Sequence, residues 1–149
     1  MKGSRLSGLI PVVLAFAAAC TGKGATSATP SGEPPRCETS FSAPAGFEQV
    51  ESFDERYSNR LGVRLGYRDA GKRELHVFAG IPGEFGEGLP DAGQVQVSGG
   101  WPGRLLGDGA VWVLVWNSNG PCASHAVLGN GFGRRGFLLV LKEAGVLPA

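Results

Sequence analysis

A run of seven apolar residues constrains the fold of this chain more than any other feature. Ala110–Trp116 reads Ala-Val-Trp-Val-Leu-Val-Trp and lies between two turn-forming segments, Asp108-Gly109 and Asn117–Pro121. β-branched and aromatic residues bounded in this way predict a buried strand. Alternate side chains of a strand point to opposite sides, so both faces of this strand are apolar and the rest of the domain must cover both.

A β-hairpin is predicted upstream of this strand. Apolar residues occupy every second position from Leu61 to Tyr67, Asp69–Lys72 form a turn, and the chain returns over Arg73–Gly80. Strict alternation of apolar and polar residues is typical of a half-buried antiparallel strand. We expect the apolar side of this hairpin to cover one face of the 110–116 strand.

Shorter patterns predict the remaining elements. Further strands are expected at 47–50, 94–97, 104–106 and 124–128, with turns at 54–57 and 99–103. Phe137, Val140, Leu141 and Ala144 follow the i, i+3, i+4, i+7 spacing of a helix face. We expect this helix to begin after Gly133, to stop near Gly145 and to cover the other face of the 110–116 strand.

These elements predict a mostly β domain of the α+β class. The 25 glycines and 10 prolines favour turns and short strands over long helices. We therefore expect a small antiparallel sheet of six or seven strands, with one C-terminal α-helix packed on it. A net charge of +1 leaves no broad basic surface, so nucleic acid is not an expected partner.

The first residues have the composition of a targeting segment. Lys2 and Arg5 precede an apolar stretch over 9–16 that is too short to span a bilayer. The segment ends in Ala17-Ala18-Ala19-Cys20, which resembles a bacterial lipobox, although Ala17 stands where that pattern most often has Leu. The resemblance implies that 1–19 is a signal peptide and that Cys20 carries diacylglycerol and palmitate. An ordinary secretory cleavage site is the alternative, because the three alanines also satisfy the A-x-A rule.

The cysteine count favours the lipidated form. The chain has three cysteines, Cys20, Cys37 and Cys122, and an exported protein seldom keeps an odd thiol. If Cys20 is lipidated, Cys37 and Cys122 form a disulfide and no thiol is left over. Residues 20–36 then serve as a tether, since 21–36 contain no large apolar residue, and 37–149 form a single disulfide-linked domain.

Two surface features are candidate partner-binding sites. Arg60, Arg64 and Arg68 alternate along one strand of the predicted hairpin, opposite Glu74 and His76. Arginines at this spacing could bind an anionic partner or lipid headgroups. We favour a solvated face with cross-strand pairs to glutamate, because a net charge of +1 leaves no broad positive field.

The second feature is the Gly/Pro-rich loop 81–93, because long loops in small domains are often functional. Its Phe85 either folds back onto the core or contacts a partner, and the exposed patch to test for would include Phe85 or Trp101. Its acidic residues Glu84, Glu87 and Asp91 fit no calcium-loop pattern.

No catalytic constellation is evident. His125 follows Cys122 by three residues, but it is expected to be a hydrogen-bonded strand residue, because no acid or second ligand accompanies it. Gly131–Gly136 matches the spacing of a dinucleotide-binding loop but lacks the parallel strand and acidic residue that such a site needs. We therefore expect no catalytic residue, cofactor or metal site.

The C-terminal half carries a second resemblance. Val95-x-Val97-x-Gly99, Trp112-x-Leu114-x-Trp116 and Val127-x-Gly129-x-Gly131, followed by a short helix with Phe137-Leu138, are similar to small extracytoplasmic β-domains. Such domains occur in bacterial lipoproteins and in anti-sigma and envelope-sensing proteins. The resemblance covers residues 95–145 and implies no catalytic residues.

The sequence thus supports two hypotheses about function. The first is an exported, non-enzymatic binding module, anchored through Cys20 to the outer leaflet of the bacterial cell membrane or another envelope membrane, with an unidentified protein or envelope partner. The second is a small exported enzyme or ligand carrier that uses the 81–93 loop as a lid near His76 or His125. A pocket with converging polar groups beside either histidine would favour the second hypothesis, and a flat apolar patch would favour the first.

Overall fold

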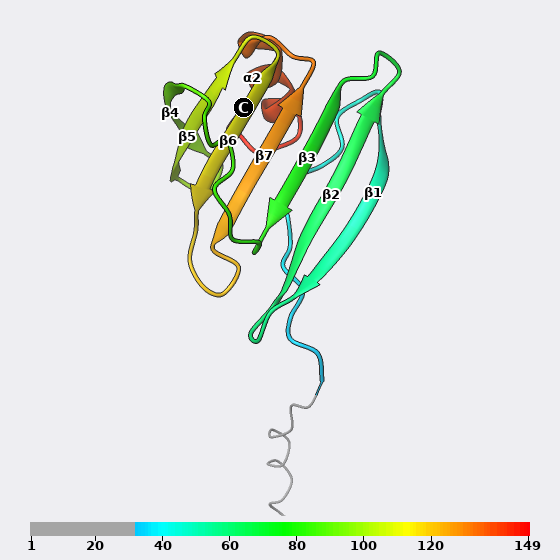
Figure 1. Ribbon diagram of the computed structural model, residues 1–149, viewed down its shortest axis with the longest axis vertical. Helices are drawn as coiled ribbons and strands as arrows, with labels where there is room; N and C mark the ends of the chain where they lie inside the picture. The colour runs from blue at the N-terminus through cyan, green and yellow to red at the C-terminus, as the bar shows by residue number, and fades with distance from the viewer. Residues whose placement is uncertain (1–31) are drawn as a thin grey trace, which may run out of the picture. The chain divides into compact units, whose positions relative to one another are not determined.

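The computed structural model describes residues 32–149, in which seven strands precede one helix (Figure 1). The elements are β1 (Phe47–Arg56), β2 (Leu61–Asp69), β3 (Glu74–Ala79), β4 (Asp91–Val97), β5 (Trp101–Asp108), β6 (Val111–Asn117), β7 (Ser124–Asn130) and α2 (Arg134–Glu143). The expected signal segment at 1–19, the expected lipidation site Cys20 and residues 21–31 of the expected tether lie outside the described residues.

All seven strands belong to one antiparallel sheet in the order β1-β2-β3-β7-β6-β5-β4. Every neighbouring pair except β3 and β7 is consecutive in sequence, so most of the sheet is built from hairpins that form locally. The predicted fold class, a mostly β domain with one C-terminal helix on the sheet, is confirmed. The 110–116 strand corresponds to β6, which lies between β7 and β5, whereas β7 is the middle strand.

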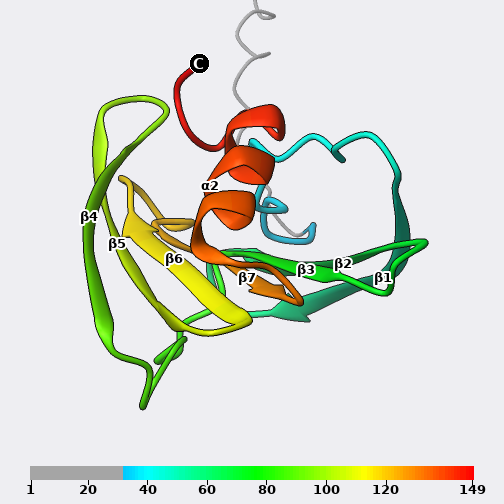
Figure 2. The ribbon, with the colours of Figure 1, turned by 90° about the horizontal axis from the view of Figure 1, so that it is seen from above.

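The sheet curves around α2, which packs on its concave face (Figure 2). Alternate residues of each strand point to this face and form the main core with the helix. Its fully buried members include Leu75, Leu105, Leu114, Val127, Phe137, Leu141 and Val146. The predicted helix is confirmed: Gly133 is its N-cap, Phe137, Val140 and Leu141 are buried, and Gly145 follows the C-cap with φ +82°.

The prediction that the hairpin of β2 and β3 covers the second face of β6 is wrong. The hairpin of β2 and β3 belongs to the same sheet, so its apolar residues Leu75 and Val77 join Trp112 and Leu114 in the core under the helix. The convex face of β6 is covered instead by the segment between β3 and β4. A Cβ atom at Gly86 of that segment would lie 2.8 Å from Leu106 and 3.4 Å from Val113.

Several strands extend beyond their expected limits, β1, β4 and β5 the furthest. β1 continues through Asp54–Arg56, where a turn is predicted, because these charged residues pair with β2 and leave their side chains exposed at the edge of the sheet. An edge strand tolerates polar side chains that a periodicity argument excludes. Similarly, β4 begins at Asp91 and β5 at Trp101, so the loop and turn around them are shorter than predicted.

The predicted disulfide between Cys37 and Cys122 is confirmed, with Cα atoms 5.6 Å apart. It joins the start of the domain to the loop that follows β6. The backbone of the same N-terminal segment pairs with β2, because Cys37 N donates to Leu61 O and Leu61 N donates to Pro35 O. Among residues 32–149, no helix is long and apolar enough to cross a membrane.

Candidate functional site

The five candidate partner-binding residues do not form one surface. Arg64 and Arg68 alternate with core residues of β2 and therefore lie on the convex face of the sheet. Phe85 lies on the same face, with its ring 4.5 Å from that of Phe78. Trp101 packs against the core on the helix side, and Arg60 precedes β2 rather than belonging to it.

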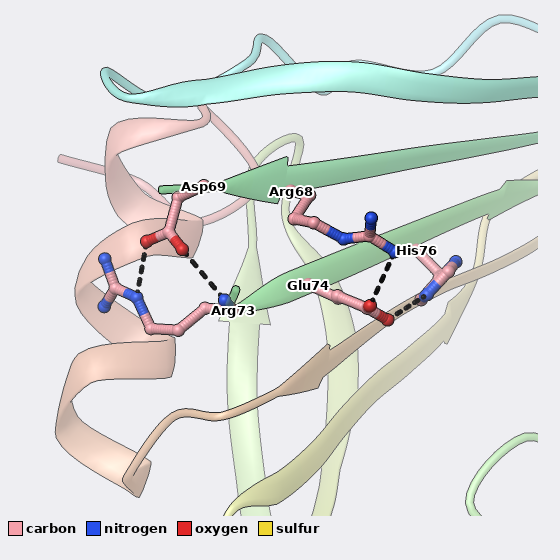
Figure 3. Close-up of polar contacts among 5 residues, drawn as sticks. All are labelled: Arg68, Asp69, Arg73, Glu74 and His76. Atoms are coloured by element: carbon pink, nitrogen blue, oxygen red, sulfur yellow. Dashed lines mark hydrogen bonds and ion pairs between the residues drawn. The ribbon is translucent and has the colours of Figure 1, made fainter. Parts of the chain in front are cut away.

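Arg68 belongs to a polar chain on the convex face (Figure 3). Its guanidinium lies 3.0 Å from Glu74 Oε1, and Nε2 of His76 lies 3.4 Å from the other oxygen of the same carboxylate. Hydrogen bonds from Arg68 and from His76 hold the pKa of Glu74 below its ordinary value. Arg68 therefore pairs across the hairpin, as one of the two sequence hypotheses expects.

Arg64 is paired in a similar way. Its Nε atom lies 2.8 Å from Glu51 Oε1 on β1, and its guanidinium stacks over the ring of Phe53 at 5.4 Å from the centroid. Both charged side chains are about 40% exposed, so this pair is solvent-screened and contributes little to stability. An anionic partner of Arg64 would have to compete with Glu51.

Arg60 holds the end of the hairpin. Its Nε atom donates to the carbonyl oxygen of Gly80 at 2.6 Å, and its guanidinium lies 4.2 Å from the ring centroid of Tyr57. A fourth arginine, Arg73, lies outside the candidate set; it pairs with Asp69 (Figure 3) and covers the rings of Phe47 and Phe132. Arg60 and Arg73 thus contact the ends of strands and the rim of the core.

A groove of about 660 Å³ lies on the convex face, between the sheet and the segment Gly83–Leu89. In Figure 1 the green segment between β3 and β4 follows this face, on the side away from α2. Four strands contribute to the floor. The floor residues whose side chains alternate outward are Gln94 of β4, Arg104 and Leu106 of β5, Val115 and Asn117 of β6, and Ser124 of β7.

The segment above the groove, Gly83–Leu89, is fixed at several points. Phe85 packs on Phe78, Leu89 N donates to Gly86 O at 2.9 Å, and Gly107 N donates to Pro90 O at 2.9 Å. Gly86 has φ +82°, a backbone conformation that strains any other residue, and a Cβ atom there would also require the Leu106 side chain to shift. Phe85 therefore packs on Phe78 of the convex face, outside the main core, and forms one wall of the groove.

The unpaired charges around the groove are acidic. Glu84 and Glu87 are exposed, and neither carboxylate has a hydrogen-bond or ion-pair partner within residues 32–149. Arg104 is the only lysine or arginine among the residues that line the groove, and Asp91 Oδ2 accepts a hydrogen bond from its Nε at 3.1 Å. The groove therefore presents two carboxylates and an already paired guanidinium.

Of the two histidines, only His125 borders the groove. Its ring stacks on Trp116 at 5.1 Å between centroids, and its Nε2 atom is hydrogen bonded to Ser118 Oγ at 2.9 Å. Burial lowers the pKa of His125, so the ring is neutral at pH 7. The expected hydrogen-bonded strand residue is thus confirmed, whereas His76 belongs to the polar chain of Arg68 and Glu74.

Sequence reasoning identified the loop but not the groove. The length and glycine content of 81–93 were the available signals. Gln94, Arg104 and Ser124 carry no motif, and only the register of the strands brings them together. Within the described part of the chain, no group of three or more histidine, cysteine or acidic side chains could hold a metal ion. No protein-family model, curated protein or solved structure matches this chain.

Proposed function

We propose that this protein is a lipid-anchored, extracytoplasmic binding protein that recognises a protein or envelope component through the groove on its convex face. The anchor is the diacylglyceryl group on Cys20, which places the domain at the outer leaflet of the cell membrane or of another envelope membrane. Because Pro35 and Arg36 pair with β2, the tether from which the domain reaches its partner is residues 20–33.

The disulfide supports export and the anchor. Disulfides persist in oxidising compartments, and the bond between Cys37 and Cys122 uses both cysteines of the domain. Cys20 is then the one cysteine left in the chain, directly after three small residues that suit lipoprotein processing. Lipidation accounts for this third cysteine without leaving a free thiol.

The groove is the single observation that carries the binding role. Its volume of about 660 Å³ falls within the range of ligand sites, and its floor carries polar side chains from four strands beside the apolar Val115. A small-ligand carrier is the second candidate function, because the groove lies beneath the 81–93 loop, although the His125 ring stacks on Trp116 on the helix side of the sheet.

The anchor is tested by labelling growing cells with radioactive palmitate. The wild-type protein is expected to take up label, and the Cys20→Ala variant is expected to take up none. Cys122→Ala, which removes a domain cysteine, serves as the matched control and should remain labelled. Absence of label from the wild type, or equal label on Cys20→Ala, would contradict the proposed anchor.

The binding role is tested by photo-crosslinking in intact cells. A photoreactive residue at the exposed position 83 lies beside the groove and leaves both of its carboxylates in place, and one at the exposed position 139 of α2 lies on the helix side of the sheet. We expect a discrete crosslinked product from position 83 and none from position 139. Equal products from both positions, or none from position 83, would remove the groove as the binding surface.

A further inference from the structure

We infer that the groove binds an extended polypeptide segment that carries lysine or arginine. This inference rests on the proposed function, since it names the class of partner that the groove recognises. The groove passes over β4, β5, β6 and β7, which contribute Gln94, Arg104, Val115 and Ser124 to its floor. Neighbouring strands lie about 4.8 Å apart, so four strands span about 14 Å, the length of four to five extended residues.

The charge of the groove selects a cation. Glu84 and Glu87 stand above the floor without partners among the described residues, whereas Arg104 already pairs with Asp91. An anionic ligand would meet two uncompensated carboxylates. A lysine or arginine side chain would instead form charge-assisted hydrogen bonds with them.

The rest of the lining suits a polypeptide better than a simple cation. Val115 on the floor, with Phe85 and Leu89 above it, forms apolar surface for the methylene stem of lysine or arginine and for a neighbouring apolar residue. The amides of Gln94 and Asn117 and the hydroxyl of Ser124 offer both donors and acceptors. An extended backbone carries both kinds of group and needs partners for them, whereas an acyl chain would leave these side chains unpaired.

The test measures binding of short labelled peptides to the full chain in a neutral detergent. The probes are fluorescein-labelled Leu-Lys-Leu-Lys-Leu, its glutamine counterpart and its glutamate counterpart, followed by fluorescence anisotropy. We expect the lysine peptide to bind at least tenfold more tightly than the other two. Its affinity should fall as salt is raised, because both carboxylates are exposed.

Matched variants locate the binding. Glu84→Gln combined with Glu87→Gln should lower the affinity for the lysine peptide at least tenfold. Glu38→Gln combined with Glu48→Gln removes the same charge from exposed positions outside the groove and should change affinity less than twofold. Arg104→Gln removes the only guanidinium of the lining and should strengthen binding severalfold. Thermal melting of each variant confirms that the domain remains folded.

Several results would overturn the inference. Equal binding of the three peptides, or an equal loss in both double variants, would show that the groove does not select cationic segments. Displacement of the lysine peptide by spermidine at equal concentration would indicate a polyamine site instead. If position 83 crosslinks a partner in cells while no lysine peptide binds, the ligand class is wrong and the proposed function stands. If neither the crosslink nor binding of the lysine peptide is observed, both the inference and the proposed binding role of the groove are contradicted.

Discussion

Gly129 shows how a single missing side chain sets the distance between the helix and the sheet. It lies in β7, and a Cβ atom at this position would fall 2.6 Å from two ring carbons of Phe137 and 3.1 Å from the ring of Phe132. The Phe137 ring therefore rests directly on the backbone of the middle strand. Gly136, in the first turns of α2, has no such neighbour, because its nearest contact would be 4.0 Å away.

Alanine substitutions at these two glycines should have opposite effects. Gly129→Ala forces the helix away from the sheet and is expected to lower the free energy of unfolding by about 1–3 kcal/mol. Gly136→Ala removes backbone freedom from a helical position with space for a methyl group. It is expected to raise the free energy of unfolding by about 0.5–1 kcal/mol. Urea denaturation of the two variants measures both changes. Similar losses in both variants would show that α2 does not pack on β7 through Phe137.

The helix α2 covers the apolar concave face of the sheet. Phe137, Val140 and Leu141 point into the core, whereas Leu139 is 54% exposed on the opposite side of the helix. The N-terminus of α2 is weakly capped, since Gly133 provides no side-chain hydrogen bond and the first turn holds no acidic residue. Packing of one apolar face, rather than helix propensity or capping, therefore holds α2 in place.

A carboxylate introduced on the buried side of α2 should prevent folding, whereas one on its exposed side should not. Phe137→Asp removes a ring worth about 3–5 kcal/mol and buries a carboxylate, so we expect no folded protein. Leu139→Asp places the same charge on the exposed side and should leave the melting temperature almost unchanged. Secreted yield and circular-dichroism melting compare the two variants. A Phe137→Asp protein that melts like the wild type would contradict the packing described for α2.

The elements that local periodicity describes were predictable from the sequence, and those that depend on distant contacts were not. β2, β3 and α2 alternate or repeat in apolar residues, so their faces follow from the sequence. Asp54–Arg56 has no apolar residue, and only pairing with Leu61–Val63 makes it a strand. The same limit applies to the site, because Glu84 and Arg104 lie on opposite sides of a groove that the strand register assembles.

For the molecule as a whole, the disulfide ties the beginning of the domain to the sheet. Cys37 is 1% exposed, and together with Val63 and Ala79 it forms a small second cluster of buried residues. Cys122 packs against this cluster from the loop that follows β6. The bond spans 85 positions of the sequence, which is most of the described chain. It therefore restricts the unfolded chain strongly.

Loss of this bond should be among the most damaging changes to the domain that leave its core side chains intact. The chain-entropy model gives about 4–5 kcal/mol for a loop of this length, against a total stability of roughly 5–15 kcal/mol for a typical domain. Cys37→Ala combined with Cys122→Ala should lower the unfolding free energy by up to that amount. Reduction of the wild type with dithiothreitol should reproduce most of the loss, whereas the same reductant should not affect the double variant. A wild-type melting temperature that is insensitive to reductant would show that the bond does not form, and would also remove the support that it lends to export.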